Sequence, residues 1–483
     1  MNFGLVKKYL YHFFLGLILL SGFLIRLKLL LDNPAFWFDE SCLGFNLLDL
    51  NFKRFFGILH LQQVAPPLFM VVSKVFVSIF GASDLKLRLF PFIVGNLSMV
   101  MFLLLLKQNF KNKWTILTGL CLFCLNVQMI KFSIEFKPYI LEVFSTCLIL
   151  YLFPKIDWNW SNKKMLSLGI CFAVIPWFAF VSAGMLFVAF ALKFTKKFLK
   201  KYLILVVPFL ISMILLAGYY LKIRNFYSDF MLDFFKQSFF TLKDFPLQFI
   251  ICFNYLFALK LAIIPFLLFL GGIICAIAKR KYNFCVSFTC LIFIGYILCS
   301  FMQIYPFYDR FMLFLFPIIL MCIMILLNVL FEVKNFFTTF LALLIVFLLI
   351  NSSIFFIQKS LSAPFNKKSY SRQMFEALVQ KQQKDDSIVV DTLSAPDFLY
   401  YNKYFNLKNR LYINLEEKDG IILYLVDKDK MPTIDSNYNS WIYSSWPSVD
   451  SQLTDYSCTE EDKKNGIDCS FHIGKLLYLK GKK

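Results

Sequence analysis

Several patterns that mark common protein classes are absent from this 483-residue sequence. It has no Walker loop and no G-x-G-x-x-G stretch, so neither phosphate-binding loop that is recognisable from sequence is present. Its three histidines are far apart, and its thirteen cysteines include a single C-x-x-C, Cys121–Cys124, with no second one to complete a zinc site. No internal repeat of the kind that many transporters contain is evident. These absences argue against a nucleotide-binding, zinc-binding or duplicated architecture.

Acidic residues are also scarce, with 30 Asp and Glu against 50 Lys and Arg, which gives a formal net charge of +20. Residues 1–358 hold 32 basic and 13 acidic residues, whereas residues 359–483 hold 18 and 17. Such basicity is compatible with nucleic-acid binding. The excess of Lys and Arg in the cytoplasmic loops of membrane proteins explains it better. We therefore predict contacts with membrane lipids and no nucleic-acid partner.

Apolar residues are abundant: 59% of the chain is hydrophobic, 19% is aromatic, and the mean hydropathy is +0.66. Many apolar runs reach roughly 17 residues or more, the length that crosses a bilayer core of about 30 Å. Backbone groups at that depth must be satisfied internally, so such runs form helices. The sequence predicts an all-α polytopic membrane bundle of about eleven transmembrane helices over residues 1–358, followed by a small α/β domain over 359–483.

The orientation of the bundle follows from its basic residues. Lys7 and Lys8 precede the first apolar run, and no small-residue cleavage site follows it, so we expect an anchoring helix that starts in the cytoplasm. The inferred cytoplasmic ends hold 17 of the 32 basic residues, and Asp157 and Glu332 are their only acids. The predicted spans cover about 9–31, 89–106, 114–130, 139–153, two that turn near 182–184, 202–221, 248–278, 284–302, 311–331 and 336–357.

This topology places two polar segments outside the cytoplasm. One is a first outer loop over 32–88, in which the short apolar stretch 66–80 lies along the membrane interface. The other is the C-terminal domain, for which we predict helices at 373–382 and 396–404 and strands at 387–391 and 420–426. Within this domain, Cys458 and Cys469 are either a disulfide or two free thiols.

The first candidate for chemistry is the pair Asp39 and Glu40, just beyond the first span. The pair directly follows the aromatic stretch Phe-Trp-Phe. A carboxylate at this interface is suited to act as a base for an acceptor hydroxyl, because partial desolvation tunes its pKa. The alternative is an interfacial aromatic belt followed by a helix-capping acid.

The second candidate lies between the third and fourth spans, in the order Glu135, Lys137, Pro138, Tyr139 and Glu142. Proline suits the first turn of a helix, so the start of the fourth span points outward and Glu142 falls about one turn into the membrane. An ionisable residue at that depth suggests a function. The alternative for Glu135 and Lys137 is an ordinary interfacial ion pair.

The third candidate is Arg310, which breaks the positive-inside trend at the outer start of the tenth span. Its planar array of donors suits a phosphate diester or a pyrophosphate. Arg26 and Arg88 also lie outside against the trend, and together such cations favour an anionic lipid. The alternative is a side chain that reaches lipid head groups.

Several short motifs occur in a fixed order along the sequence. They are Asp39-Glu40, Gln63–Phe69 (QVAPPLF), Phe80–Asp84 (FGASD), Leu87–Pro91 (LRLFP), Glu135–Tyr139 (EFKPY) and Tyr308–Phe311 (YDRF). In that order and spacing the motifs resemble the bacterial GT-C-type glycosyltransferases that use polyprenyl-phosphate sugars, relatives of the protein O-mannosyltransferases and of the lipid A aminoarabinose transferases. The resemblance covers about residues 5–330 and is strongest over 20–145.

The resemblance implies an active site on the outer face and a polyprenyl-phosphate sugar as donor. It also implies a loop acid that assists the acceptor, a role that carries over to Asp39 with Glu40 beside it. Many relatives have arginine where Lys137 stands, so the charge is kept without the bidentate fork. The oligosaccharyltransferase relatives hold a metal with an acidic pair in the second outer loop. No such D-x-D or D-x-E stands there, so no cofactor is predicted to be required, with a divalent metal as the alternative.

The sequence therefore predicts an enzyme of the bacterial inner membrane that acts on its outer face. In the expected mechanism, Asp39 takes the proton of the acceptor, and the phosphate lipid leaves with inversion at the sugar. The acceptor is a glycolipid, a glycan or a protein. The alternative function is a polytopic transporter or a lipid or polysaccharide flippase. Donor-phosphate binding is assigned to Lys137, Arg310 and Arg88, and orientation of the sugar or acceptor to Glu135, Tyr139, Glu142 and Gln63.

Overall fold

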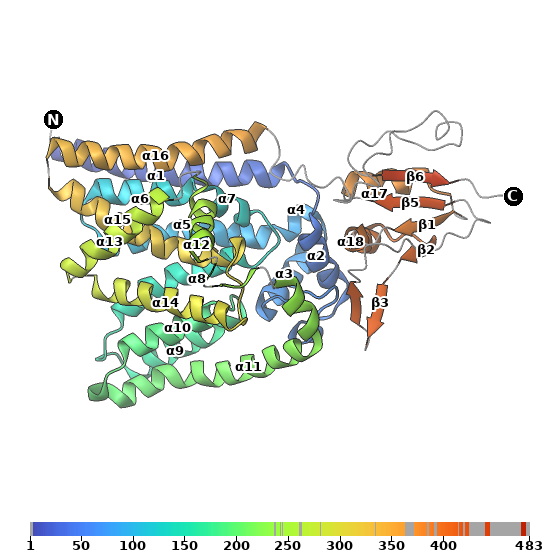
Figure 1. Cartoon of the computed structure of the whole chain (residues 1–483), viewed down its shortest axis with the longest axis horizontal. Helices are drawn as coiled ribbons and strands as arrows, with labels where there is room; N and C mark the ends of the chain where they lie inside the picture. Colours follow the sequence, from blue (N-terminus) through green and yellow to red (C-terminus); the bar gives the residue numbers. More distant parts are fainter. Residues whose placement is uncertain are drawn as a thin grey trace. The chain divides into compact units, whose positions relative to one another are not determined.

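A computed structural model gives the architecture of the chain (Figure 1). It describes residues 3–235, 238–241, 243, 245–259, 263–280, 282–333, 335–362, 371–383, 386–390, 394–413, 415–418, 421–424, 440–444 and 475–479. The chain divides into two compact units. The membrane unit comprises residues 1–31, 66–69 and 88–362. The other comprises 32–65, 70–87 and 363–483, and we call it the outer unit after the location that the sequence predicts for it. The first outer loop, which the sequence analysis grouped with the helices, thus packs with the C-terminal segment.

The membrane unit is a bundle of α-helices with short 3₁₀ segments between them. Among the candidate membrane spans of the described chain, the one that contains α15 is the most buried, and it is apolar all round, as expected of a helix surrounded by others. The α-helices and the one 3₁₀ helix used below are α1 (Phe3–Leu31), α5 (Leu89–Asn109), α6 (Lys113–Cys124), α7 (Val127–Ser133), α8 (Tyr139–Leu152), α9 (Asn162–Val174), α10 (Ser182–Lys193), α11 (Leu199–Phe235), α12 (Phe245–Phe257), α13 (Ile263–Ala278), α14 (Asn283–Phe301), η6 (Asp309–Leu315), α15 (Phe316–Glu332) and α16 (Phe336–Ser362).

Six helical segments of the described chain are long and apolar enough to cross a membrane, and a seventh is the bent pair α6 and α7. The chain is therefore a multi-pass membrane protein, and the polytopic helical bundle predicted from the sequence is confirmed. The expected total of eleven spans stays a prediction. Shorter apolar helices occupy several of the other predicted positions.

Three details of the predicted spans need correction. The predicted span 248–278 is two helices, because the chain leaves α12 at Ala258 in a left-handed conformation (φ 51°). The predicted turn near 182–184 lies earlier, since α10 already begins at Ser182. Helix α11 continues to Phe235 instead of ending near 221, because no helix breaker follows the apolar run.

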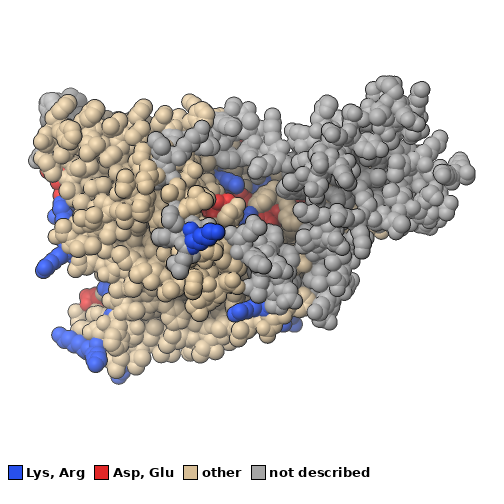
Figure 2. All heavy atoms as spheres, in the orientation of Figure 1, with Lys and Arg blue, Asp and Glu red and all other residues tan. Residues whose placement is uncertain are grey.

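Helices α1, α11 and α16 all begin at the same end of the membrane unit, on the left in Figure 1. Figure 2 shows basic side chains at that end on the face drawn, together with a few acidic ones, and a second group of basic and acidic side chains nearer the middle of the face. The separation of a basic end from the rest of the bundle agrees with the charge pattern of the sequence.

The outer unit combines a four-stranded sheet with helices, as the sequence predicted for the C-terminal segment. The sheet has the order β2-β1-β5-β6, in which β1 pairs in parallel with β2 and β5, and β5 pairs antiparallel with β6. Strands β3 and β4 form a separate antiparallel pair. The elements are α2 (Phe38–Asp49), η1 (Phe52–Phe56), α3 (Pro67–Phe80), α4 (Asp84–Leu87), α17 (Ser371–Lys381), β1 (Ser387–Val390), α18 (Ala395–Phe405), β2 (Arg410–Ile413), β3 (Leu415–Lys418), β4 (Ile421–Tyr424), β5 (Ser440–Ser444) and β6 (Lys475–Leu479). Cys458 and Cys469 lie outside the described residues.

Asp84 joins the first outer loop to the C-terminal segment inside the outer unit. Its carboxylate is almost fully buried and accepts hydrogen bonds from the hydroxyls of Tyr400 (3.0 Å) and Tyr401 (2.9 Å). Arg372 approaches the same carboxylate at 3.3 Å. A buried carboxylate needs such partners because isolated burial of a charge is costly.

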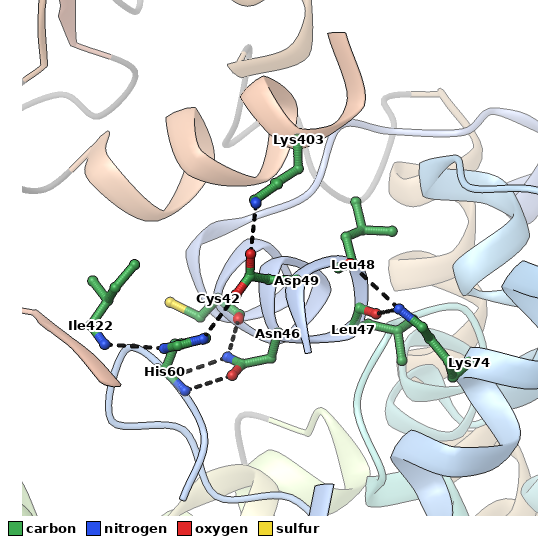
Figure 3. Close-up of polar contacts among 9 residues, drawn as sticks. All are labelled: Cys42, Asn46, Leu47, Leu48, Asp49, His60, Lys74, Lys403 and Ile422. Carbon is green, nitrogen blue, oxygen red and sulfur yellow. Dashed lines mark hydrogen bonds and ion pairs between the residues drawn. The ribbon is translucent and has the colours of Figure 1, made fainter. Parts of the chain in front are cut away.

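A second link between the same two segments centres on His60 (Figure 3). Asn46 fixes the His60 backbone, since its side chain accepts from the His60 N–H (2.6 Å) and donates to the His60 carbonyl (3.0 Å). Asp49 lies 3.0 Å from His60 Nε2 and 2.6 Å from the Nζ of Lys403 in α18. Lys74 of α3 donates to the Leu47 carbonyl near the end of α2.

Candidate functional site

The loop between α7 and α8 carries two of the predicted site residues. Its backbone turns tightly, since the Lys137 N–H donates to the Glu135 carbonyl over 2.7 Å. Glu135 and Lys137 are both buried, and the ring of Phe136 between them packs 5.4 Å from that of Phe69. Pro138 caps α8, one position before the first turn predicted for it.

The segment before α15 supplies Arg310 and is held from α14. The Tyr296 hydroxyl donates to the Pro306 carbonyl over 2.7 Å, which ties the loop after α14 to that helix. Asp309 then starts the 3₁₀ helix with a positive φ of 27°, a strained conformation for a residue with a side chain. Strain of this kind is frequent at functional sites. The Arg310 guanidinium lies 5.9 Å from the centre of the Tyr139 ring at the start of α8.

These two segments meet in the membrane unit. Lys131 belongs to α7, and Glu135 follows it by four residues, in the loop after that helix. The Nζ atom of Lys131 lies 4.0 Å from Oε2 of Glu135. The charges of Asp309, Glu135 and Arg310 all act on the Tyr255 hydroxyl of α12, and those of Arg310 and Lys131 act on the Asp309 carboxylate. We call Lys131, Glu135, Asp309 and Arg310 the charged cluster. It contains two cations and two carboxylates, bordered by the phenol groups of Tyr139 and Tyr255.

Glu142 lies one turn into α8 and is 4% exposed. Its Oε2 atom has no hydrogen-bond partner among the described residues. The Glu142 charge acts on the hydroxyls of Tyr296 and Tyr305, and Tyr305 belongs to the loop that leads to Arg310. A carboxyl without a full set of partners at this depth is available to a polar ligand.

Such an arrangement can bind an anion through two cations at once. The cations of the charged cluster would neutralise the charge of a phosphate. Its carboxylates would hold the cations in place and accept hydrogen bonds from sugar hydroxyls. Tyr308 lies beside the cluster and is half exposed. The charge of the Asp309 carboxylate and partial burial raise the pKa of the Tyr308 hydroxyl.

Asp39 and Glu40 belong to the outer unit. Both lie in the first turn of α2, where the free N–H groups favour acidic side chains, and the Glu40 N–H donates to the Trp37 carbonyl over 2.8 Å. Glu40 is fully buried, whereas Asp39 is partly exposed. Gln63 also belongs to this unit and donates to the Leu61 carbonyl over 3.3 Å.

Arg88 and Arg26 belong to the membrane unit, and both are fully buried. Arg88 stands immediately before α5, and its carbonyl accepts the first helical bond from Phe92. Arg26 donates to groups of three helices and does not reach outward as the sequence suggested. Neither position tests the phosphate-binding role predicted for Arg88.

Among the predicted residues, the structure brings Glu135, Tyr139 and Arg310 together, with Lys137 in the same loop and Glu142 below it. Sequence reasoning missed Lys131, Asp309 and Tyr255. Lys131 had a signal, because it precedes Glu135 by one helical turn. Asp309 stood next to Arg310 in a quoted motif, whereas nothing in the sequence pointed to Tyr255. Among the described residues, no group of three or more His, Cys, Asp or Glu is placed to hold a metal ion.

Comparison with known proteins rests on structure. No protein-family model and no curated protein sequence matches the chain. The crystal structure of ArnT from Cupriavidus metallidurans in the apo state superposes with a TM-score of 0.58 at 10% identity, covering 99% of this chain and 100% of that one. The chain has a GT-C-type fold. The predicted fold class is confirmed by this match.

Two archaeal structures with the GT-C-type fold match less closely. The Archaeoglobus fulgidus oligosaccharyltransferase in complex with Zn and sulfate has a TM-score of 0.46 at 17% identity. The oligosaccharyltransferase AglB from the same organism, in complex with an inhibitory peptide and a dolichol-phosphate, has a TM-score of 0.48 at 14% identity. Both matches cover 82% of this chain, which spans 62% and 64% of the length of those proteins.

Proposed function

We propose that this protein is an integral membrane glycosyltransferase that moves a sugar from a polyprenyl-phosphate donor to an acceptor outside the cytoplasm. The observation that carries the proposal is the charged cluster in a bundle with a GT-C-type fold. A bundle that only crosses the membrane has no need of a buried and a partly buried carboxylate beside two cations, because each charge costs free energy at that depth.

The position of the cluster along the bundle supports an active site on the outer face. Helix α1 begins at the basic end, and successive spans alternate in direction, so the ends of α7 and α14 fall at the opposite end. By the positive-inside rule the basic end is cytoplasmic. The loops with Glu135 and Arg310 then face the outside, in the inner membrane of a bacterium.

In the proposed mechanism, Arg310 and Lys137 bind the donor phosphate, with Arg88 and Lys131 adding to the positive potential. Asp39 accepts a proton from the acceptor hydroxyl, whose oxygen attacks the anomeric carbon from the side opposite the phosphate. The bond between that carbon and the phosphate oxygen breaks, and the phosphate lipid leaves with the electron pair. One such displacement inverts the anomeric configuration. Glu135, Glu142, Tyr139 and Gln63 orient the cations or bind sugar hydroxyls.

Purified protein in detergent separates this proposal from transport, because transport has no meaning without two compartments. We expect the protein to release radiolabelled sugar from a polyprenyl-phosphate sugar, with the label recovered in a glycolipid, glycan or protein acceptor from a bacterial envelope extract. A chelator arm decides whether a divalent metal is needed, and the proposal expects activity to survive it. A purified, folded protein that consumes none of a panel of polyprenyl-phosphate hexoses and pentoses would instead favour a transporter or flippase.

A further inference from the structure

Arg26 is one of the largest fully buried side chains of the protein, and the mechanism proposed above does not use it. It lies in α1, within the first apolar span. Its guanidinium donates three hydrogen bonds: Nη1 to the Gly22 carbonyl (3.0 Å), Nη1 to the Cys124 carbonyl (2.9 Å) and Nε to Ser133 Oγ (3.1 Å). A charged group in a span needs a reason to be there.

Two of the three acceptors of Arg26 lie at the ends of two consecutive helices, α6 and α7. Cys124 is the last residue of α6, and Ser133 is the last residue of α7, with a bend of 52° between the two helices. A helix end leaves carbonyls without partners, and a cation there also interacts favourably with the helix dipole. Arg26 therefore satisfies the end of α6 and at the same time holds the end of α7.

The start of α7 is fixed independently of Arg26. The Asn126 side chain accepts from the N–H groups of Gln128 (3.0 Å) and Met129 (3.1 Å), and it donates to the Leu256 carbonyl of α12 (2.7 Å). Arg26 reaches across from α1 and donates to both sides of the bend. Its rigid, multi-donor fork can do this, whereas a single ammonium group cannot.

The loop with Glu135 and Lys137 begins directly after Ser133. We propose that Arg26 is a positioning residue that clamps α7 and thereby sets the place of Glu135 and Lys137 in the site. The expected effect on the rate of sugar transfer rests on the proposed function. The expected effect on the position of α7 rests only on the hydrogen bonds of Arg26. Displacement of catalytic groups by about 1 Å costs on the order of 100-fold in rate.

Hydrogen–deuterium exchange tests the clamp without reference to activity. In Arg26→Lys, amides of residues 126–138 should exchange about tenfold faster than in the wild type, the effect of losing one hydrogen bond to a charged donor. Amides of α15 should be unchanged, and the control Lys107→Gln, which removes an exposed cation from α5, should leave both regions unchanged. If Arg26→Lys does not purify in a folded form, Ser133→Ala removes the Nε acceptor and takes its place. Unaltered exchange over 126–138 in the folded variant overturns the clamp.

A kinetic cycle tests the positioning role. Arg26→Lys should lower kcat about 100-fold while the KM for the acceptor stays within about twofold. In a Lys137→Met background, where one of the two groups that it positions is already gone, the same change should lower the residual rate by clearly less than about 100-fold. Full multiplication of the two losses overturns positioning through this loop. A wild-type protein that transfers no sugar would contradict the proposed function. The hydrogen–deuterium exchange experiment would still show whether Arg26 clamps α7.

Discussion

His60 Nδ1 accepts a hydrogen bond of 3.0 Å from the backbone N–H of Ile422 in strand β4. The return bond runs from the Leu61 N–H to the Ile422 carbonyl over 2.7 Å, so the first outer loop is paired with the C-terminal segment through the backbone. An accepting Nδ1 carries no proton, and Nε2 must then donate to Asp49. The neutral form of His60 is therefore the one that fits this link.

The outer unit should weaken on acidification. Burial lowers the pKa of His60, the Asp49 carboxylate opposes this in part, and Arg54 and Lys403 lower it further. The unfolded chain therefore binds the proton more readily, and stability that is full above about pH 6.5 declines below it. Burial raises the pKa of Asp49, but Lys403 and His60 outweigh it and lower that pKa, so its contribution is lost in the same direction at still lower pH.

Thermal unfolding between about pH 7.5 and 5.5 measures this effect. The wild type and His12→Gln, which changes an exposed histidine of α1, should lose stability over this range. His60→Gln should be less stable at pH 7.5 and nearly independent of pH. Equal pH slopes in all three proteins would show that His60 is not the titrating group.

The bonds from Tyr400 and Tyr401 to Asp84 should stabilise the outer unit. Tyr401→Phe removes a hydroxyl that donates to a buried carboxylate, and we expect a loss of about 1.5–3 kcal/mol in the free energy of unfolding. Tyr404→Phe on the same helix is the control, because that side chain is exposed, and it should change stability little. Denaturant unfolding followed by tryptophan fluorescence measures both, and equal losses would contradict the assignment.

Gly95 allows α5 to approach the end of α7. A Cβ at Gly95 would lie 2.2 Å from Ser133 Oγ, whereas a Cβ at Gly184 in α10 would meet nothing within 4 Å. Small residues at such crossings let membrane helices pack closely. Gly95→Ala should therefore cost about 1–3 kcal/mol, and Gly184→Ala should be neutral or stabilise by about 0.5–1 kcal/mol. Thermal unfolding in one detergent ranks the two variants, and the reverse order would contradict the packing.

Arg310 should matter for its fork as well as its charge. Arg310→Met should lower sugar transfer by about 100- to 1,000-fold, the loss typical of one group that stabilises a developing charge. Arg310→Lys should retain part of the rate, and Lys137→Arg, which keeps the charge, should retain most of it. The control Arg280→Met removes an exposed arginine elsewhere and should leave transfer unchanged. Equal rates for Arg310→Met and Arg280→Met would remove Arg310 from the site.

Much of the fold could be predicted from the sequence, because bilayer thickness fixes how long an apolar run must be to span it. The runs of α5, α14 and α16 therefore gave helices close to the observed ones, as did the amphipathic pattern of α17. The break at Ala258 escaped prediction, because no proline or glycine marks it and the left-handed residue is an alanine.

The charged cluster could be predicted only in part. Glu135 and Arg310 drew notice because charges at those depths are costly. Their meeting with Asp309 and Tyr255 depends on how α8, α12 and η6 pack against one another, and hydropathy carries no information on that packing. Asp84 illustrates the same limit: its motif was visible, but its partners Tyr400 and Tyr401 lie more than three hundred residues later.

The rate of sugar transfer by Asp39→Asn, set against that of Asp157→Asn, tests the proposed chemistry most directly. Both changes remove one negative charge and keep the size of the side chain. Asp157 is an exposed acid of the membrane unit that accepts a hydrogen bond from the Asn159 N–H, and the amide oxygen of an asparagine can accept the same bond. With a general base lost, Asp39→Asn should be slower by about 100- to 10,000-fold at unchanged stability, while Asp157→Asn should match the wild type. Wild-type turnover by folded Asp39→Asn would contradict the mechanism.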